Sequence, residues 1–158
     1  MNYIPVGQIL QMLFDAVPKK SAEELCAICR NLGMTDQAFD VDDIDVGTQP
    51  YDAGHHFSFH IDPDTEAKFE ILAIRGQTFQ AGLQVLVPTS LTRSESKQLQ
   101  QEIEGILDKK YGPGIPIKNE SISMINYQGN DTTAYVSNIW YGGVEMLTVR
   151  VGNRKFIG

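Results

Sequence analysis

Lysine and arginine are absent from a long stretch of this 158-residue sequence, between Asn31 and Ala67. The whole chain has 13 lysines and arginines against 20 aspartates and glutamates, which gives a net charge of −7 at pH 7. Nucleic-acid binding depends on basic side chains that neutralise phosphates. We therefore expect no nucleic-acid partner.

Cysteine is also scarce, because Cys26 and Cys29 are the only two in the chain. Two cysteines cannot build the disulfide framework of a small secreted protein. A chain of this length buries roughly 70% of its unfolded surface without such bridges. We therefore expect one domain over residues 1–158, with a hydrophobic core of its own.

Long apolar runs are missing as well, since no segment approaches the roughly 20 residues that cross a bilayer. The N-terminal segment has no basic region, and Gln8, Gln11 and Asp15 interrupt its apolar positions, unlike in a signal peptide. We expect no membrane association and a cytoplasmic location, although an export signal removed from a precursor would leave no trace in this sequence.

Motifs of nucleophilic and cofactor-dependent catalysis are absent too. The sequence contains no G-x-S-x-G, no P-loop, no Rossmann glycine pattern and no H-E-x-x-H. We therefore expect no cofactor, and a non-enzymatic role is favoured over an enzymatic one.

The sequence does contain many acidic residues, and they are concentrated in its first part. Residues 1–92 carry 13 acids and five bases, whereas residues 93–158 carry seven acids and eight bases. The stretch without bases holds nine acids: Asp36, Asp40, Asp42, Asp43, Asp45, Asp52, Asp62, Asp64 and Glu66. Such a segment attracts a basic surface at a rate that falls as salt rises. The alternative interpretation is that a long solvated connection simply collects aspartate, a good turn residue.

Two helices are predicted before the acidic stretch. Apolar residues at helical spacing, from Val6 to Val17, indicate the first helix, which ends at Pro18. The second begins at Ser21, where Ser21-Ala22-Glu23-Glu24 is a capping box, and it ends at Gly33.

A β-meander and a third helix follow. The acidic stretch itself has only a weak strand signal, around Ala38 to Val41. The meander strands are predicted over His55 to Ile61, Lys68 to Arg75 and Phe79 to Val87, with a Gly76-Gln77 turn between the last two. A second capping box at Thr92 begins a helix that ends at Tyr111-Gly112.

The last third of the chain predicts three more strands, over Ile122 to Tyr127, Thr132 to Tyr141 and Val144 to Val151. Gly142-Gly143 is a strong hairpin turn. Pairing across it places Val136 opposite Val149 on one face and Tyr135 opposite Arg150 on the other. The predicted fold class is therefore α+β: two N-terminal helices, an antiparallel β-meander, a central helix and a C-terminal antiparallel three-stranded segment.

The spacings of Cys26 with Cys29 and of His56 with His60 suggest a zinc site, and the aspartates from Asp40 to Asp45 suggest a calcium site. Neither site has the full pattern. His56 and His60 on a strand would lie about 13 Å apart, too far for one tetrahedral zinc ion. Cys29 shares the apolar stripe of its helix, where a free cysteine behaves as a small hydrophobe. The aspartates from Asp40 to Asp45 lack the glycine and the glutamate of an EF-hand loop, so calcium bound in another arrangement stays an alternative.

The leading functional hypothesis is a non-enzymatic binding protein whose acidic segment contacts a basic partner protein. The expected contacts are acids and two aromatic anchors: Phe39, Asp40, Asp42, Asp43, Asp45, Tyr51 and Asp52. In size, acidity and lack of catalytic motifs the chain is similar to many bacterial immunity proteins and secretion chaperones, which implies a single protein partner. Type III secretion chaperones resemble it less, because they usually end in a helix and this chain ends in a hairpin.

Two alternatives remain open. One is a small-ligand-binding protein or hydrolytic enzyme with a histidine–aspartate site on one strand, formed by His55, His56, His60 and Asp62. The other is a homo-oligomer that buries one face of the C-terminal hairpin, through Tyr135, Ile139, Tyr141 and Met146.

Overall fold

The computed structural model describes residues 3–37, 51–87, 93–119, 122–141 and 144–156. Its helices are α1 (Val6–Ala16), α2 (Ala22–Asn31) and α3 (Arg93–Tyr111). Its strands are β1 (Thr35–Gln37), β2 (Ala53–Asp62), β3 (Thr65–Ile74), β4 (Gln77–Val87), β5 (Ile115–Lys118), β6 (Ile122–Gln128), β7 (Thr132–Tyr141) and β8 (Val144–Asn153).

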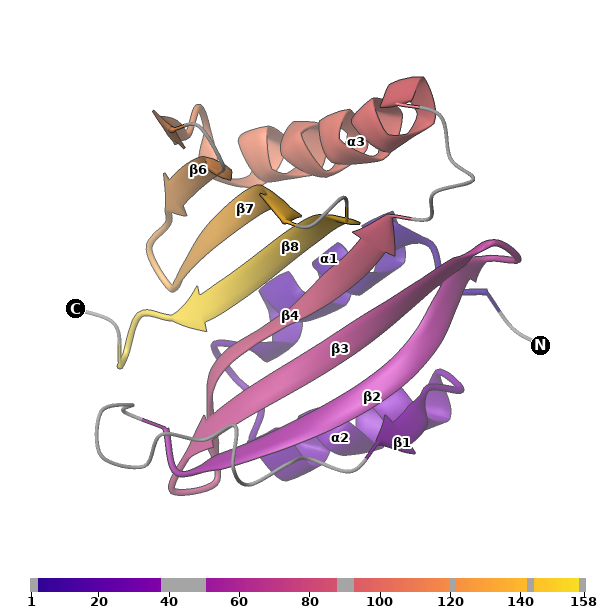
Figure 1. Ribbon diagram of the computed structural model, residues 1–158. Coiled ribbons are helices and arrows are strands. Elements are labelled where there is room, and N and C mark those ends of the chain that lie inside the picture. Colours follow the sequence, from indigo (N-terminus) through magenta and orange to yellow (C-terminus); the bar gives the residue numbers. More distant parts are fainter. Residues whose placement is uncertain (1–2, 38–50, 88–92, 120–121, 142–143, 157–158) are drawn as a thin grey trace.

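The strands form one antiparallel sheet in the order β1-β2-β3-β4-β8-β7-β6-β5 (Figure 1). The α+β class is confirmed, but the predicted arrangement is only partly correct. The predicted meander and C-terminal segment are joined into a single sheet, because β4 pairs along its length with β8. Both edge strands, β1 and β5, are missing from the prediction, since segments of three and four residues are too short for a clear alternation. The weak signal at Ala38 to Val41 lies outside the described residues.

The ends of the N-terminal helices follow from local sequence. Pro5 is the N-cap of α1. At α2 the predicted capping box is confirmed, because Ser21 Oγ accepts the Glu24 N–H at 3.1 Å and Glu24 Oε1 accepts the Ser21 N–H at 3.3 Å. Gly33 follows α2 with φ of 91°, a conformation that glycine adopts without strain.

The β3–β4 turn lies one residue earlier than predicted. Ile74 pairs with Gln77, so Arg75 and Gly76 form the turn instead of Gly76 and Gln77. Their φ angles are 50° and 80°, and two consecutive positive φ values are the signature of the two-residue turn that matches strand twist.

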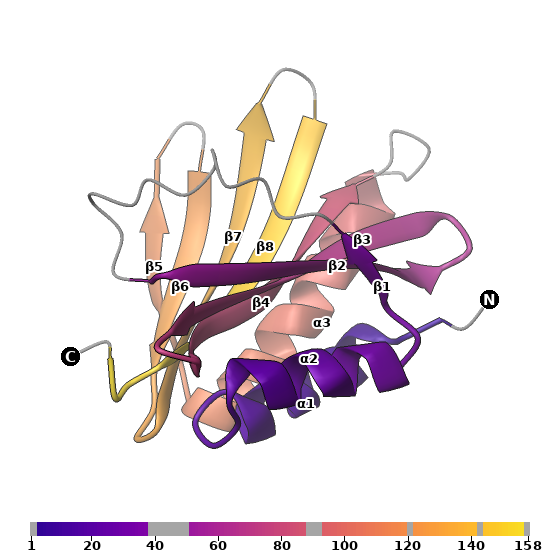
Figure 2. The same cartoon turned by 90° about the horizontal axis from the view of Figure 1, so that it is seen from below.

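The hydrophobic core lies between the helices and one face of the sheet. Figure 2 shows α1, α2 and α3 clustered together on the same side. Alternate strand residues such as Phe57, Phe69 and Val149 are fully buried in one cluster with helix residues such as Leu13. The Tyr127 hydroxyl donates to Asp108 of α3 at 2.9 Å, which ties α3 to β6 on this face.

The register of the C-terminal hairpin is as predicted. Tyr135 pairs with Arg150, and Val136 pairs with Val149. Val136 and Val149 face the core, whereas Tyr135 and Arg150 point to the opposite face, which we call the helix-free face. No helix in the described ranges lies over that face, and no described helix is long and apolar enough to cross a membrane.

Candidate functional site

A single row of residues crosses the helix-free face from one edge of the sheet to the other. Successive antiparallel pairings place these residues side by side, one from each strand: Gln37, His56, Glu70, Gly82, Arg150, Tyr135, Asn126 and Ile115. The middle of this row is the most chemically distinctive part of the sheet surface.

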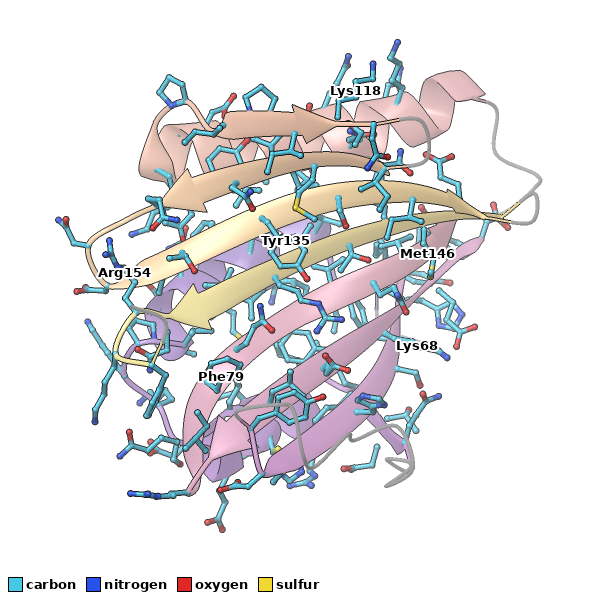
Figure 3. All side chains as sticks on the ribbon, turned by 60° about the vertical axis from the view of Figure 1, so that its left-hand side comes forward. Lys68, Phe79, Lys118, Tyr135, Met146 and Arg154 are labelled. Carbon is cyan, nitrogen blue, oxygen red and sulfur yellow. The ribbon has the colours of Figure 1, made fainter. Side chains whose placement is uncertain are left out.

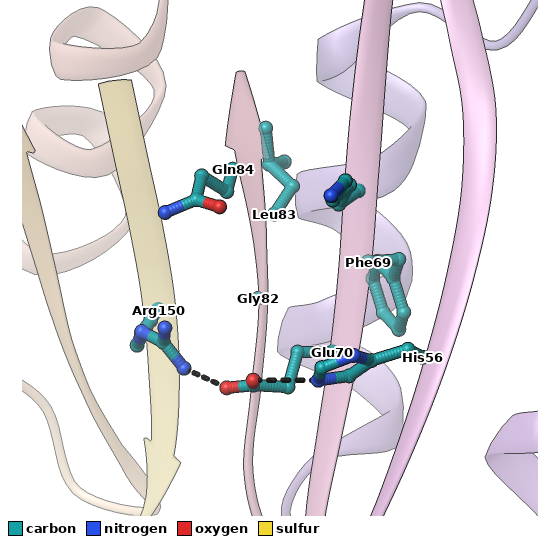
Figure 4. Close-up of a pocket in the computed structure, with 8 residues that line it drawn as sticks. His56, Phe69, Glu70, Gly82, Leu83, Gln84 and Arg150 are labelled. Carbon is teal, nitrogen blue, oxygen red and sulfur yellow. Dashed lines mark hydrogen bonds and ion pairs between the residues drawn. The ribbon is translucent and has the colours of Figure 1, made fainter. Parts of the chain in front are cut away.

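Glu70 joins two basic groups at the centre of the row. One carboxylate oxygen lies 2.9 Å from His56 Nε2, and the other accepts a hydrogen bond from the Arg150 guanidinium (Figure 4). The side chains of His56, Glu70 and Arg150 are 27%, 27% and 23% exposed. The group is thus partly shielded from water, and its charges are neutralised internally.

Gly82 makes the Glu70–Arg150 contact possible. It lies in register between them on β4, and Figure 4 shows the Arg150 side chain extending toward Glu70 past this strand. A Cβ atom on Gly82 would lie 2.1 Å from the Val149 carbonyl oxygen and 2.8 Å from Arg150 Cα. Only glycine therefore allows β8 and the Arg150 side chain to come this close.

The electrostatics of the cluster keep it ionised. Burial alone would raise the pKa of Glu70, but the charge of Arg150 and the hydrogen bonds from Arg150 and His56 hold that pKa below its usual range. Burial opposes the charge of Arg150, yet Glu70 and Tyr135 raise the pKa of its guanidinium. Burial raises the pKa of the Tyr135 hydroxyl, an effect that the neighbouring Arg150 partly offsets.

A hollow opens beside this cluster. Its volume is about 440 Å³, and its lining combines aromatic, polar and charged side chains: Tyr51, Glu70, Leu72, Phe79, Gln80, Tyr135 and Arg150. Tyr51 stacks on Phe79 with ring centroids 6.4 Å apart. A smaller hollow of about 50 Å³ lies across the ion pair, lined in part by His56, Lys68 and Gln84. Residues of the helix-free face line both hollows; Figure 3 labels Lys68, Phe79 and Tyr135 among them.

Of the expected partner contacts, the described residues include only Tyr51 and Asp52. Tyr51 lines the larger hollow. Asp52 is exposed, and its Oδ2 atom accepts the Arg75 N–H at 2.9 Å. Phe39, Asp40, Asp42, Asp43 and Asp45 lie outside the described residues, as does the possible calcium loop.

The four residues of the alternative histidine site point to different places. His55 pairs with Ile71 and faces the helix side, whereas His56 and His60 face the opposite side. His56 has Glu70 as its carboxylate partner, while Asp62 Oδ1 accepts the Asp64 N–H in the β2–β3 turn. The structure therefore places these four residues in at least two separate environments.

The face expected for a homo-oligomer is the same helix-free face. Tyr135, Ile139 and Met146 are half-buried on it, and the side chain of Tyr141 lies outside the description. Two further residues on that face, Ile115 and Ile117, are 66% and 52% exposed at the β5 edge.

The cysteines belong to the core. Cys26 and Cys29 are 2% and 0% exposed. Burial raises the pKa of Cys29 to about 12. Within the described ranges no group of three or more histidine, cysteine or acidic side chains could hold a metal ion. Both thiols therefore act as small apolar side chains.

The residues that sequence reasoning missed are Glu70, Gly82, Gln80 and Phe79. The hairpin turn had already predicted that Tyr135 pairs with Arg150. The register between β4 and β8 was the missing information, because the two strands are separated by α3 and three other strands and no local turn sets their alignment. The glycine at position 82, inside a strand of strict alternation, was the available signal for a close approach.

Comparisons with family models, with curated proteins and with solved structures find no match to this chain.

Proposed function

We propose that this protein is a non-enzymatic binding protein that receives a basic partner protein on the helix-free face of its sheet. The observation that carries the proposal is the composition of the larger hollow. Aromatic side chains that can anchor a partner, Tyr51, Phe79 and Tyr135, surround a charged pair that is already satisfied.

The neutralisation of Glu70 by its neighbours favours a binding role for this surface over a catalytic one. The Glu70 carboxylate is engaged by both Arg150 and His56, and its pKa is held down by them. A general base needs a pKa near the working pH and an accessible lone pair. A neutralised surface with tyrosines on it is instead typical of a contact surface, where aromatic residues supply much of the binding energy.

Exposed acids at the β1–β3 edge of the sheet support a basic partner. Glu66 pairs with His60 and lies on the helix-free face, whereas Asp36 pairs with Phe57 and faces the helix side. Asp52, Asp62 and Asp64 are exposed at the two ends of β2. The only described base paired with any of these carboxylates is Arg30, with Asp36 at 3.0 Å. Exposed carboxylates at this edge attract a cationic surface and orient it.

Two variants with the same chemical change test the proposal. Gln80 lines the hollow and is half-buried, so Gln80→Arg places a bulky positive group where the partner would bind. Gln98 is exposed on α3, so Gln98→Arg is the matched control. Each protein is immobilised and exposed to a native lysate, and retained proteins are identified by mass spectrometry.

The proposal predicts one basic protein that is retained by the unmodified protein and by Gln98→Arg, and lost from Gln80→Arg. Equal retention by all three proteins would show that the helix-free face is not the binding surface. A retained partner of acidic composition would contradict the electrostatic part of the proposal.

A further inference from the structure

Three basic side chains gather where β8 ends, in a chain with a net charge of −7. Lys19 comes from the α1–α2 connection, and Arg154 and Lys155 directly follow β8; Figure 3 shows Arg154 at this end of the strand. They share a hollow of about 590 Å³. Beside the three bases its lining contains one proline, two asparagines and one acid: Pro18, Asn130, Asn153 and Asp131.

Asn153 holds the two basic segments in place. Its side chain is 7% exposed, and its amide donates to the Val17 carbonyl at 3.2 Å and to the Thr78 carbonyl at 3.1 Å. Its Oδ1 atom accepts the Lys155 N–H at 3.1 Å. This one side chain therefore connects the end of α1, the start of β4 and the backbone of the segment after β8, the segments that carry the three bases.

The bases are held by neutral groups and not by acids. Arg154 donates to the Gly129 carbonyl at 2.8 Å, and Lys155 donates to Gln77 Oε1 at 3.0 Å. Asp131 lines the same hollow, yet within the described ranges no ion pair joins it to Lys19, Arg154 or Lys155. Like charges repel one another, yet three bases and one acid leave this lining positive in a chain whose net charge is −7.

We propose that this hollow is a binding site for a small phosphate-bearing molecule. The Arg154 guanidinium is a planar fork that matches two phosphate oxygens, and the two lysines supply point charges. The side-chain amide of Asn130, which also lines the hollow, can donate to a third oxygen. Arg154 already uses one guanidinium nitrogen on Gly129, which fixes its orientation and leaves other donors for the ligand.

This site does not depend on the proposed partner surface. Its residues lie at the ends of elements, and none of them lines the hollow beside Glu70 and Arg150. Loss of phosphate binding would therefore leave partner binding intact, and the converse also holds.

Calorimetric titration with inorganic pyrophosphate at constant ionic strength tests the site. The variant is Arg154→Gln/Lys155→Gln. The control, Lys97→Gln/Lys109→Gln, removes two exposed positive charges from α3 instead. We expect saturable binding to the unmodified protein and to the control, with a Kd at least about tenfold higher for the variant. Amide chemical shifts of Lys19, Asn130 and Asn153 that move with pyrophosphate would locate the site without any substitution.

Three results would overturn the proposal: no saturable binding up to about 10 mM pyrophosphate, equal affinity for citrate, or equal affinity of the variant and the unmodified protein. Equal affinity for citrate would mean that the cluster attracts any multivalent anion without recognising phosphate. Far-ultraviolet circular dichroism of both double variants establishes that each is folded.

Discussion

Arg150 on β8 binds Glu70 on β3 across an intervening strand. Neighbouring strands lie about 4.8 Å apart, so the two backbones are about twice that distance from each other. The contact forms because β4 has Gly82 at the facing position. One missing side chain thus allows the two halves of the sheet to share an ion pair on the helix-free face.

Gly82→Ala is expected to destabilise the fold. The new methyl group would meet backbone atoms of Val149 and Arg150, which cannot rotate away, and overpacking of this kind costs about 1–3 kcal/mol. Gly105→Ala is the matched control: Gly105 lies within α3 with open space around its Cβ position, so alanine there should stabilise by about 1 kcal/mol. Urea unfolding of both variants measures these free energies. A stable Gly82→Ala protein would show that β4 and β8 are less close than described.

Glu70→Gln is expected to make stability less dependent on acid pH. The folded state holds the pKa of Glu70 below its usual range, so the stabilisation is present above the ordinary glutamate pKa of about 4.3. It is lost as the pH falls through the lower folded-state value. Near neutral pH the variant should be about 1–3 kcal/mol less stable, because Arg150 loses a charged partner.

The difference in unfolding free energy between the unmodified protein and Glu70→Gln should therefore shrink below about pH 4.5. Glu102→Gln, an exposed change on α3, controls for the loss of one negative charge. A difference that stays constant down to pH 2 would contradict the shifted carboxylate.

The two thiols are expected to be unreactive in the folded protein. Cys29 is fully buried and burial raises its pKa to about 12, and burial also raises the pKa of Cys26. The thiolate is the reactive form, so a thiol reagent at pH 8 should label neither cysteine until urea is added. Rapid labelling under native conditions would contradict the burial of the two thiols in the core.

Replacing Asp42, Asp43 and Asp45 with asparagine is expected to slow association with a basic partner. Electrostatic steering depends on local charge and is strongest at low salt. The control is Asp15→Asn/Glu23→Gln/Glu102→Gln, which changes the net charge by the same amount elsewhere. Association rates measured at about 20 and 300 mM salt should separate the two variants at the lower value only. Identical rates would show that the acidic segment does not steer the partner.

Local signals in the sequence were enough for most elements. The capping box at Ser21 and the glycine at position 33 predicted the limits of α2, and the Gly142-Gly143 turn predicted the β7–β8 register correctly. These features involve residues within a few positions of each other, where propensity and turn geometry decide the outcome. The β3–β4 turn was misplaced by one residue because Arg75 adopts a positive φ that its residue type rarely takes.

The candidate site was harder to predict because its residues are far apart in the sequence. Glu70 and Arg150 are separated by 80 positions. They meet only through the β4–β8 pairing, and both strands have apolar residues that would satisfy several alignments. Periodicity identifies which face of a strand is buried, but it does not identify the neighbour. The glycine at position 82 becomes informative only once that neighbour is known.

The affinity of the captured partner for Gln80→Arg and Gln98→Arg, measured by calorimetry beside the unmodified protein, tests the central claim most directly. If the helix-free face is the binding surface, Gln80→Arg should weaken binding at least about tenfold, or about 1.4 kcal/mol, while Gln98→Arg stays within about twofold. Equal affinity of both variants and the unmodified protein would contradict the claim.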